Sequence, residues 1–221
     1  MAGREGRPKG KKGEFGMDLF EYDDYEHYVR AQTQGNKDKI SMSGIGLEII
    51  GEIQKRIPYA THILCHGTRG GWEQEFFQQA YGEHAFVWGT EISSTVKERK
   101  IPRTTQWDFT LPKKQWRGKF DIVFSNSLDH SIDPRKTLTT WMDQLRPTGS
   151  LILEMHLPKE ANDDWVPTKT DPLAYTSKEM IALLKDMNLK IVDQWPSPKF
   201  TDYRGAYGVY ASGRPTLRIQ K

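Results

Sequence analysis

The sequence predicts a doubly wound α/β fold, with a mostly parallel seven-stranded sheet, helices on both faces and a C-terminal antiparallel hairpin. Three observations support this fold class. Strand-like and helix-like segments alternate from Thr61 onward. Residues 120–125, Phe-Asp-Ile-Val-Phe-Ser, are almost wholly apolar, as expected of a central parallel strand. Two late strand-like segments, residues 189–195 and 206–212, are joined by a polar connection, which predicts the hairpin.

The composition is that of one well-buried domain with short extensions, since 36% of the 221 residues are hydrophobic and 28% are charged. No segment approaches the ~20 apolar residues of a membrane span. The basic N-terminus lacks the apolar core of a secretion signal. A single cysteine, Cys65, rules out an internal disulfide and fits a reducing compartment. We therefore expect a cytoplasmic protein without a membrane partner.

The sequence divides into three regions. Residues 1–16 are expected to form a disordered basic tail, because five basic residues crowd its first dozen positions. The tail could contact nucleic acid or another polyanion, or could simply increase solubility. Residues 17–58 are expected to form a helical extension. Its first part carries Tyr22, Tyr25 and Tyr28 at helical spacing and could be a lid over a ligand or an outer layer.

A second helix is expected over residues 43–57, where Leu47, Ile50, Ile53 and Ile57 make a buried stripe and Pro58 ends it. Residues 59–221 then form the α/β domain.

The opening unit of this domain predicts a nucleotide-like ligand. It has a buried strand over residues 63–65, a turn with three glycines, a helix from residue 72 to about 80, and a strand ending at Glu91. Glycines let the main chain approach a ligand closely, and the helix N-terminus presents unpaired N–H groups. Glu91 follows Gly71 by about 20 positions, where an acidic residue can accept hydrogen bonds from both ribose hydroxyls.

The remaining elements alternate along the chain. We expect a helix over 94–100, a strand over 104–107, a polar loop over 113–119, the strand 120–125, a helix over 134–145, a turn over 146–149, a strand over 150–155, a long loop over 157–175 and a helix over 178–187. Because the carboxyl ends of parallel strands meet at one edge, Cys65–Gly71, Glu91, Asp108 and Ser125–His130 are expected to lie there together.

With these residues placed, the chain resembles the class I S-adenosylmethionine-dependent methyltransferases over roughly residues 43–212. The most specific part begins with the Phe120–Ser125 strand and runs through Asn-Ser-Leu-Asp-His-Ser-Ile-Asp-Pro to the segment Leu-Arg-Pro-Thr-Gly-Ser-Leu-Ile-Leu-Glu at 145–154. It is similar to the family's fourth strand, the next helix, its L-(K/R)-P-G-G turn and its fifth strand. The late strands are similar to the hairpin that separates this fold from dinucleotide-binding dehydrogenases. The resemblance implies a Rossmann-like methyltransferase domain, residues 59–221, that uses S-adenosylmethionine.

The resemblance also implies site roles near the glycine turn and the fourth strand. The turn would lie against the amino-acid part and the ribose of the cofactor, through Gly67, Thr68, Arg69, Gly70 and Gly71. The methionine end would be lined by Ser125 and Asn126.

The nucleoside end has four further positions in the resemblance. Glu91 would bind the ribose hydroxyls and Ile92 would pack on the adenine. Asp108 would accept a hydrogen bond from the adenine amino group, and the main chain at Phe109 would pair with a ring nitrogen.

The sequence departs from the family pattern at three positions. Cys65 stands where the family often has an acidic residue, so the amino group of the ligand needs another partner. Arg69 replaces a glycine. With it, the turn resembles a subgroup spelled G-x-R-x-G-x-E, which implies that Arg69 and Glu73 pair across the turn. Thr148 replaces a glycine in the later turn.

His130 is the candidate catalytic residue. It follows the fourth strand and could serve as a general base, since the charge of histidine changes near neutral pH, or it could hydrogen-bond the loop. His62 and His66 flank Cys65, but no further cysteine or histidine lies at zinc-ligand spacing, so no metal is expected.

Two acceptor classes are disfavoured. Methylation of amino groups on DNA bases goes with an Asp/Asn-Pro-Pro-aromatic sequence, whereas residues 126–129 are Asn-Ser-Leu-Asp. Cytosine C5 chemistry needs a Pro-Cys nucleophile, and Cys65 is in the first strand. We expect a small-molecule or soluble acceptor. The alternatives are a nicotinamide-dependent oxidoreductase and a non-catalytic or nucleic-acid-binding protein.

Overall fold

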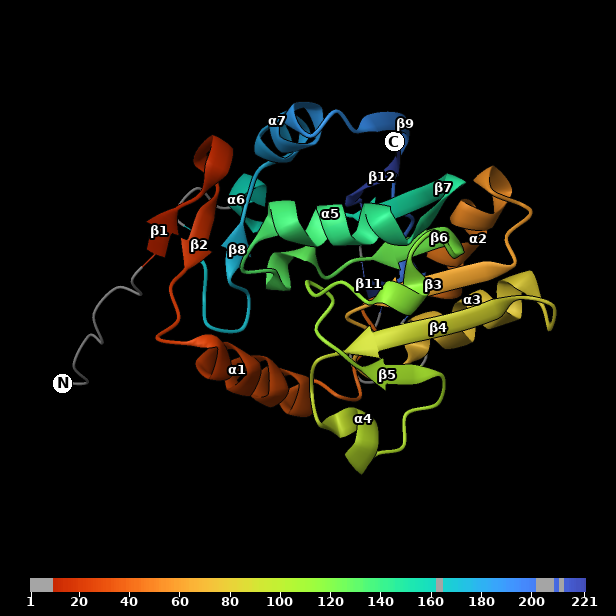
Figure 1. Ribbon diagram of the computed structural model, residues 1–221, viewed down its shortest axis with the longest axis horizontal. Helices are drawn as coiled ribbons and strands as arrows, with labels where there is room; N and C mark the ends of the chain where they lie inside the picture. The colour runs from red at the N-terminus through yellow and green to blue at the C-terminus, as the bar shows by residue number, and fades with distance from the viewer. Residues whose placement is uncertain (1–9, 162–164, 202–208, 211–212) are drawn as a thin grey trace.

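The computed structural model describes residues 10–161, 165–201, 209–210 and 213–221 (Figure 1). Its central sheet has seven strands in the order β5-β4-β3-β6-β7-β12-β9. These are β3 (His62–His66), β4 (Phe86–Glu91), β5 (Thr104–Gln106), β6 (Phe120–Ser125), β7 (Leu145–Glu154), β9 (Lys190–Pro196) and β12 (Pro215–Gln220). The first five in this order are parallel, and β12 runs antiparallel to both β7 and β9. The predicted fold class is confirmed.

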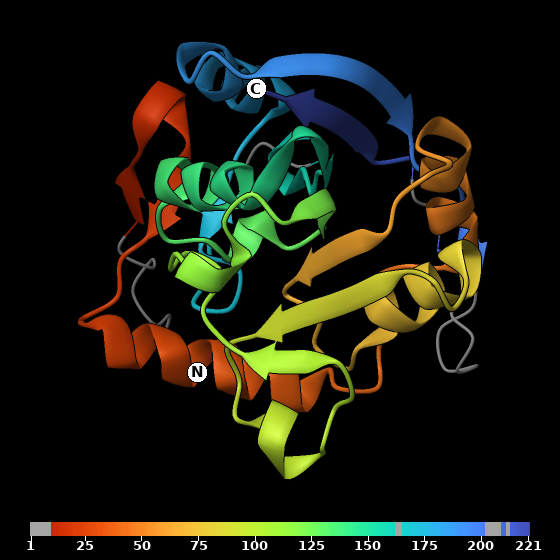
Figure 2. The same cartoon turned by 45° about the vertical axis from the view of Figure 1, so that its right-hand side comes forward.

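Helices cover both faces of this sheet (Figures 1 and 2). They are α2 (Leu47–Arg56) and α3 (Trp72–Tyr81) on one face, and α5 (Pro134–Gln144) and α7 (Ser177–Asp186) on the other. Successive strand residues point to opposite faces. Leu64 and Val123 therefore join the core under α5 and α7, while Ile63 and Ile122 join the core under α2 and α3. Since both faces are covered, a ligand site is left to the ends of the strands.

The N-terminal segment differs from the prediction. We predicted a disordered tail through residue 16, but β1 (Gly10–Lys12) pairs with β2 (Asp18–Phe20), which pairs in turn with β8 (Leu173–Ala174). The prediction is wrong for residues 10–16 because β2 supplies a partner strand and the Asp18 carboxylate pairs with Lys12 at 2.5 Å. The rest of the expected tail, residues 1–9, lies outside the described residues.

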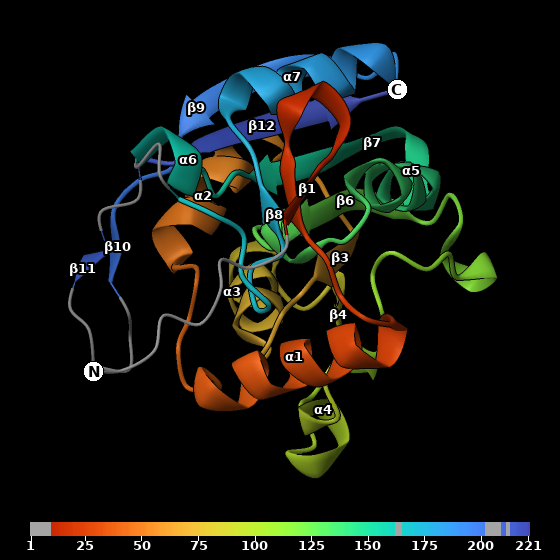
Figure 3. The ribbon, with the colours of Figure 1, turned by 90° about the vertical axis from the view of Figure 1, so that its left-hand side faces the viewer.

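Helix α1 (Tyr25–Asp38) crosses the carboxyl ends of the parallel strands, together with the small β1-β2-β8 sheet (Figure 3). Asp24 caps it by accepting a hydrogen bond from the backbone N–H of His27. Its buried face includes Tyr28 and Gln32, so one helix turn presents an aromatic and an amide group to the strand ends.

The larger differences from the prediction concern β7, the last strand and the loop over 157–175. Strand β7 begins at Leu145 rather than residue 150, because the expected turn is an irregularity within the strand, where the register to β6 shifts. The last strand of the sheet is β12, not 206–212; of that segment only 209–210 are described, as β11 (Val209–Tyr210) paired with β10 (Phe200–Thr201). The expected loop 157–175 contains α6 (Pro158–Ala161) and β8.

Shorter elements complete the description. They are η1 (Glu14–Gly16), α4 (Thr95–Glu98), η2 (Lys114–Trp116) and η3 (Leu128–His130). Among the described helices, none is both long enough and apolar enough to cross a membrane.

One buried histidine is expected to make the stability of this fold depend on pH. His66, the last residue of β3, is 1% exposed and stacks on Trp141. Its ring nitrogens lie 2.8 Å from the Thr90 hydroxyl and 2.7 Å from the Gln144 side-chain oxygen. Burial lowers the pKa of His66 to about 4, because the apolar surroundings disfavour the charged ring. The ring is therefore neutral in the folded protein near pH 7.

This gives a prediction for acid stability. The unfolded chain binds a proton at His66 below about pH 6.5, whereas the folded chain does so only below about pH 4. The contribution of neutral His66 to the free energy of unfolding is therefore fully present above pH 6.5. It is lost as the pH falls toward 4, and the loss is about 2 kcal/mol at pH 5. Urea unfolding at pH 7 and pH 5 measures this loss, and His66→Gln should remove most of the difference. An equal loss in wild type and variant would contradict the assignment.

Candidate functional site

A cleft lies at the carboxyl ends of the parallel strands, beside α1. Two adjoining halves share Lys39, Gly67, Arg69, Ser127 and His130 as lining residues. One half, lined by Glu91 and here called the Glu91 half, spans about 540 Å³, and the other, lined by Asp129 and called the Asp129 half, spans about 990 Å³; both volumes include solvent at the open side. The strand-end position is where ligands bind in this kind of sheet.

The glycine turn between β3 and α3 forms the wall between the halves. The backbone N–H groups of Gly67 and Thr68 both donate to the Thr90 carbonyl, at 3.0 Å each. Gly67 has a φ of 73°, and a Cβ there would lie 2.6 Å from the Cβ of Ser127. The missing Cβ thus lets the backbone lie against the loop after β6.

Glu91 lies where the sequence predicts it, at the end of β4 beside the glycine turn. Its Oε2 accepts from the backbone N–H of Arg69 at 3.0 Å, and its Oε1 accepts from the backbone N–H of Ser93 at 2.9 Å. The residue is 7% exposed and lines the Glu91 half together with Ile92 and Phe109. Because each carboxylate oxygen can accept two hydrogen bonds, Glu91 retains capacity for ligand hydroxyls.

Helix α1 forms the roof of this half. Tyr28, Gln32 and Asn36, which follow one another at helical spacing, line the cavity. The Tyr28 hydroxyl also donates to the backbone carbonyl of His130 at 3.1 Å. Of the two roles left open for this segment, a cover over a cleft fits this geometry. The sequence analysis named Tyr28 in a possible lid but missed Gln32 and Asn36, although three polar or aromatic side chains on one helix face were the available signal.

Asp108 lies behind the roof and is not among the residues that line either half. Its Oδ1 accepts from the backbone N–H of Thr110 at 2.8 Å, and its Oδ2 accepts from the Tyr25 hydroxyl at 2.8 Å. Because Asp108 lines neither half, its contact with adenine stays a prediction. Phe109 does line the Glu91 half.

The positions predicted for the methionine end separate in space. Asn126 lines the Asp129 half and donates from Nδ2 to the Gly44 carbonyl at 3.2 Å. Ser125 is fully buried and donates to the His66 carbonyl, so it supports the wall. Ser127, which the sequence did not single out, lines both halves. Gly70 and Gly71 are not among the lining residues; Gly71 is the N-cap of α3.

The expected Arg69–Glu73 pair is not among the ion pairs of the described residues. Arg69 instead donates from Nη1 to the Met42 carbonyl at 3.3 Å. Glu73 lines the Asp129 half, is 5% exposed, and its Oε2 has no hydrogen-bond partner among the described residues. Burial raises the pKa of Glu73 to about 8, so the carboxyl group is mostly protonated at pH 7.

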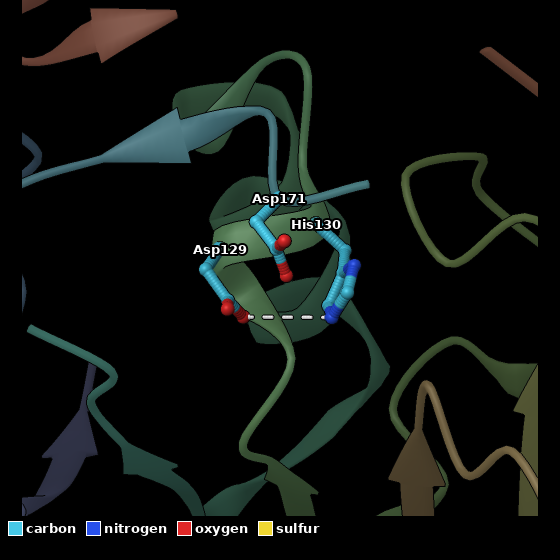
Figure 4. A group of neighbouring side chains, drawn as sticks. All are labelled: Asp129, His130 and Asp171. Atoms are coloured by element: carbon cyan, nitrogen blue, oxygen red, sulfur yellow. Dashed lines mark ion pairs between the residues drawn. The ribbon is translucent and has the colours of Figure 1, made fainter. Parts of the chain in front are cut away.

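The Asp129 half brings together side chains from separate loops. Asp129 and His130 follow β6, His156 follows β7, and Asp171 precedes β8 (Figure 4). His156 Nδ1 lies 2.8 Å from Asp129 Oδ2. Burial would raise the pKa of Asp129, but its basic neighbours His130, His156 and Arg214, together with the hydrogen bond that His156 donates, hold the pKa below its usual value. Asp129 is therefore a carboxylate at neutral pH.

The tautomer of His130 follows from its contacts. Its Nδ1 lies 2.7 Å from the Thr170 carbonyl and 3.0 Å from Gln32 Oε1. A carbonyl can only accept, so Nδ1 carries the hydrogen and the neutral ring has its lone pair on Nε2. That atom is 4.0 Å from Asp129 Oδ1.

Comparison with known proteins identifies the fold. No family model and no curated protein matches the chain by sequence. Among solved structures, the Burkholderia thailandensis 1,6-didemethyltoxoflavin-N1-methyltransferase, bound to 1,6-didemethyltoxoflavin and S-adenosylhomocysteine, superposes with a TM-score of 0.61 at 12% identity, covering 96% of this chain and 98% of that one. The glycopeptide N-methyltransferase MtfA with sinefungin gives 0.57 at 15% identity, covering 80% and 87%.

A third solved structure, a SAM-dependent methyltransferase from Aquifex aeolicus, gives a TM-score of 0.54 at 11% identity and covers 91% of this chain and all of that one. At these identities the likeness establishes the fold, and the chain has the fold of class I S-adenosylmethionine-dependent methyltransferases.

The glycine turn gives a testable prediction. Gly67→Ala should lower the free energy of unfolding by about 2 to 3 kcal/mol, because the new methyl group meets Ser127 and the backbone has a positive φ. Adding Ser127→Gly should relieve the steric overlap and regain that part of the free energy of unfolding, while the cost of the positive φ remains. Gly51→Ala on α2, where no atom lies within 4 Å, is the matched control and should be neutral or stabilising. Chemical denaturation measures all three, and an unchanged Gly67→Ala protein would contradict the tight approach.

Proposed function

We propose that the protein is an S-adenosylmethionine-dependent methyltransferase acting on a small-molecule acceptor. The observation that carries the proposal is the Glu91 carboxylate, held at the strand end and facing a half-cleft that Ile92 and Phe109 line. A carboxylate beside apolar walls suits the ribose and base of a nucleoside. The solved structures with the same fold that were crystallised with S-adenosylhomocysteine or sinefungin support this choice of ligand.

Glu73 is proposed as the partner of the cofactor's amino group. The sequence has Cys65 where related proteins often have an acid, and the charge of Glu73 is close enough to Cys65 to help raise the pKa of the thiol, which burial raises most. The buried Glu73 Oε2 lacks a partner among the described residues and lines the same cleft. An ammonium group would satisfy this oxygen and convert Glu73 to the carboxylate.

The other predicted cofactor contacts remain part of the proposal. The backbone at Gly67–Gly71 would lie along the amino-acid part and ribose, and Asn126 would line the methionine end. S-adenosylmethionine supplies an electrophilic methyl group, so the chain's tasks are to orient the ligands, exclude water and manage a proton. Helix α1 covers the Glu91 half of the cleft. His130, with Nδ1 held by the Thr170 carbonyl, offers Nε2 to a proton from the acceptor.

A small acceptor is favoured because a structural neighbour binds 1,6-didemethyltoxoflavin. The antiparallel β12 between β7 and β9 disfavours the nicotinamide-dependent alternative. The nucleic-acid-binding alternative rests on the basic tail. No described contact favours it.

Isothermal titration with S-adenosylhomocysteine tests the proposal. Wild-type protein should bind it in the micromolar range and should not bind reduced nicotinamide dinucleotide. Glu91→Gln should weaken binding about 10- to 100-fold, through loss of charged hydrogen bonds to the ribose. The exposed Glu83→Gln is the matched control and should bind as wild type. No heat with either S-adenosylhomocysteine or S-adenosylmethionine at near-millimolar concentration would overturn the proposal.

The role of Glu73 has its own test. Because its carboxyl group is mostly protonated at pH 7, binding of an ammonium group should release a proton, and affinity should rise as the pH approaches 8. Titrations in two buffers of different ionisation enthalpy count that proton. Glu73→Gln should remove the release and weaken S-adenosylhomocysteine about tenfold. It should leave 5′-methylthioadenosine, which lacks the amino-acid part, unaffected. Equal weakening of both ligands would show that Glu73 only supports the fold.

A further inference from the structure

We propose that Asp129, His130 and Asp171 form a binding site for a divalent transition-metal ion in the Asp129 half of the cleft. Each residue offers one donor atom, and the three atoms lie within 4.8 Å of one another. Figure 4 shows the three side chains converging on one point from two segments of the chain. The expectation of no metal rested on cysteine and histidine spacing, which cannot detect a group whose members are so far apart in sequence.

An unpaired oxygen is the second, independent observation. Asp129 is 4% exposed, and its Oδ1 has no hydrogen-bond partner among the described residues. Its other oxygen, Oδ2, is already bound to His156 Nδ1 at 2.8 Å. A buried carboxylate oxygen without a partner is costly, and native structures rarely keep one without a ligand or ion. A cation beside Oδ1 would remove this cost.

The atoms that do not face the common point are held by hydrogen bonds. His130 Nδ1 donates to the Thr170 carbonyl at 2.7 Å. Asp171 Oδ2 accepts from the hydroxyls of Thr170 at 2.9 Å and Thr168 at 3.1 Å. Together with the His156–Asp129 contact, every member of the group is oriented through its far atom. Metal ligands are characteristically fixed in this way.

The donor set and its spacing select the ion. One imidazole nitrogen with two carboxylate oxygens suits Mn²⁺, Fe²⁺, Co²⁺ or Zn²⁺ better than Mg²⁺, which prefers oxygen ligands alone. Ligands at about 2.1 Å from a tetrahedral ion stand about 3.4 Å apart. The 4.0 Å between Asp129 Oδ1 and His130 Nε2 would therefore shorten by about 0.6 Å on binding, and no pair of the three atoms, which all lie within 4.8 Å of one another, would shorten by more than about 1.4 Å. Lys39 and Arg214 line the same half and offset part of the negative charge, so micromolar affinity is expected.

The role of the ion rests on the proposed function, whereas its binding does not. Three protein ligands leave coordination positions open toward the cleft, where the acceptor would bind. An ion there would lower the pKa of an acceptor hydroxyl. The His130 Nε2 lone pair would then serve coordination, and the proton would be lost to solvent.

Titration of tag-free, chelator-treated full-length protein with Mn²⁺ tests the site, with the paramagnetic resonance signal of free Mn²⁺ as the readout and no nucleoside present. Wild type should bind about one ion per chain. Asp129→Asn and Asp171→Asn should each weaken binding more than about 100-fold, and His156→Gln, which removes an orienting contact, about tenfold. Glu83→Gln should bind as wild type. Thermal melting of the metal-free variants checks that each one is folded before its Mn²⁺ affinity is compared with that of wild type.

The outcomes separate this inference from the proposed function. No Mn²⁺ uptake by wild type, or uptake that Asp129→Asn and Asp171→Asn leave unchanged, would overturn the metal site even if S-adenosylhomocysteine binds. Uptake that depends on both aspartates would support it even if no nucleoside binds. Competition by Zn²⁺ at lower concentration than Mg²⁺ is expected from the imidazole ligand, and the reverse order would overturn the choice of a transition metal.

Discussion

The carboxylate of Glu91 is the contact on which the site depends. It ends β4 and accepts one backbone N–H from the glycine turn after β3 and another from the start of the loop that leads to α4. The two strands are paired along their length, up to His66 beside Thr90, so this one side chain ties two neighbouring strand ends together. The group proposed to hold the ribose is thereby fixed before any ligand arrives, as an efficient site requires.

Three buried acids in one cleft are held in three different states. Glu91 is bonded to two N–H groups, Glu73 is kept mostly protonated by burial, and Asp129 is kept ionised by its basic neighbours. Environment rather than residue type decides these differences. The same cleft can therefore offer separate acidic positions to sugar hydroxyls, to an ammonium group and to a metal ion.

Local pattern predicted the sheet, the helices and the position of Glu91. Strand β6 was predicted at its observed bounds because its short apolar run is typical of a buried central strand. The position of Glu91 was predicted because the turn, the helix and the next strand follow one another at a fixed spacing. Sequence patterns did not predict the features that depend on contacts with other parts of the chain. Residues 10–12 are a strand only because β2 lies beside them, and the last strand was predicted at 206–212 rather than at β12, although its partner β9 was placed correctly. Asp171 reaches the cleft through a loop whose path no periodicity predicts, and helical spacing groups the roof residues on one face without showing that this face lies over the strand ends.

The roof has a consequence for the order and speed of events. Tyr25 holds Asp108, and Tyr28 holds the backbone of His130, so α1 is fastened over the Glu91 half of the cleft. Opening these fastenings would widen the path by which the proposed nucleoside enters and leaves. Lids of this kind often make product departure slower than chemistry. The exchange of spent for fresh cofactor, rather than methyl transfer itself, would then set the turnover rate, and α1 would be the moving part that evolution or an engineer could adjust without touching the reacting groups.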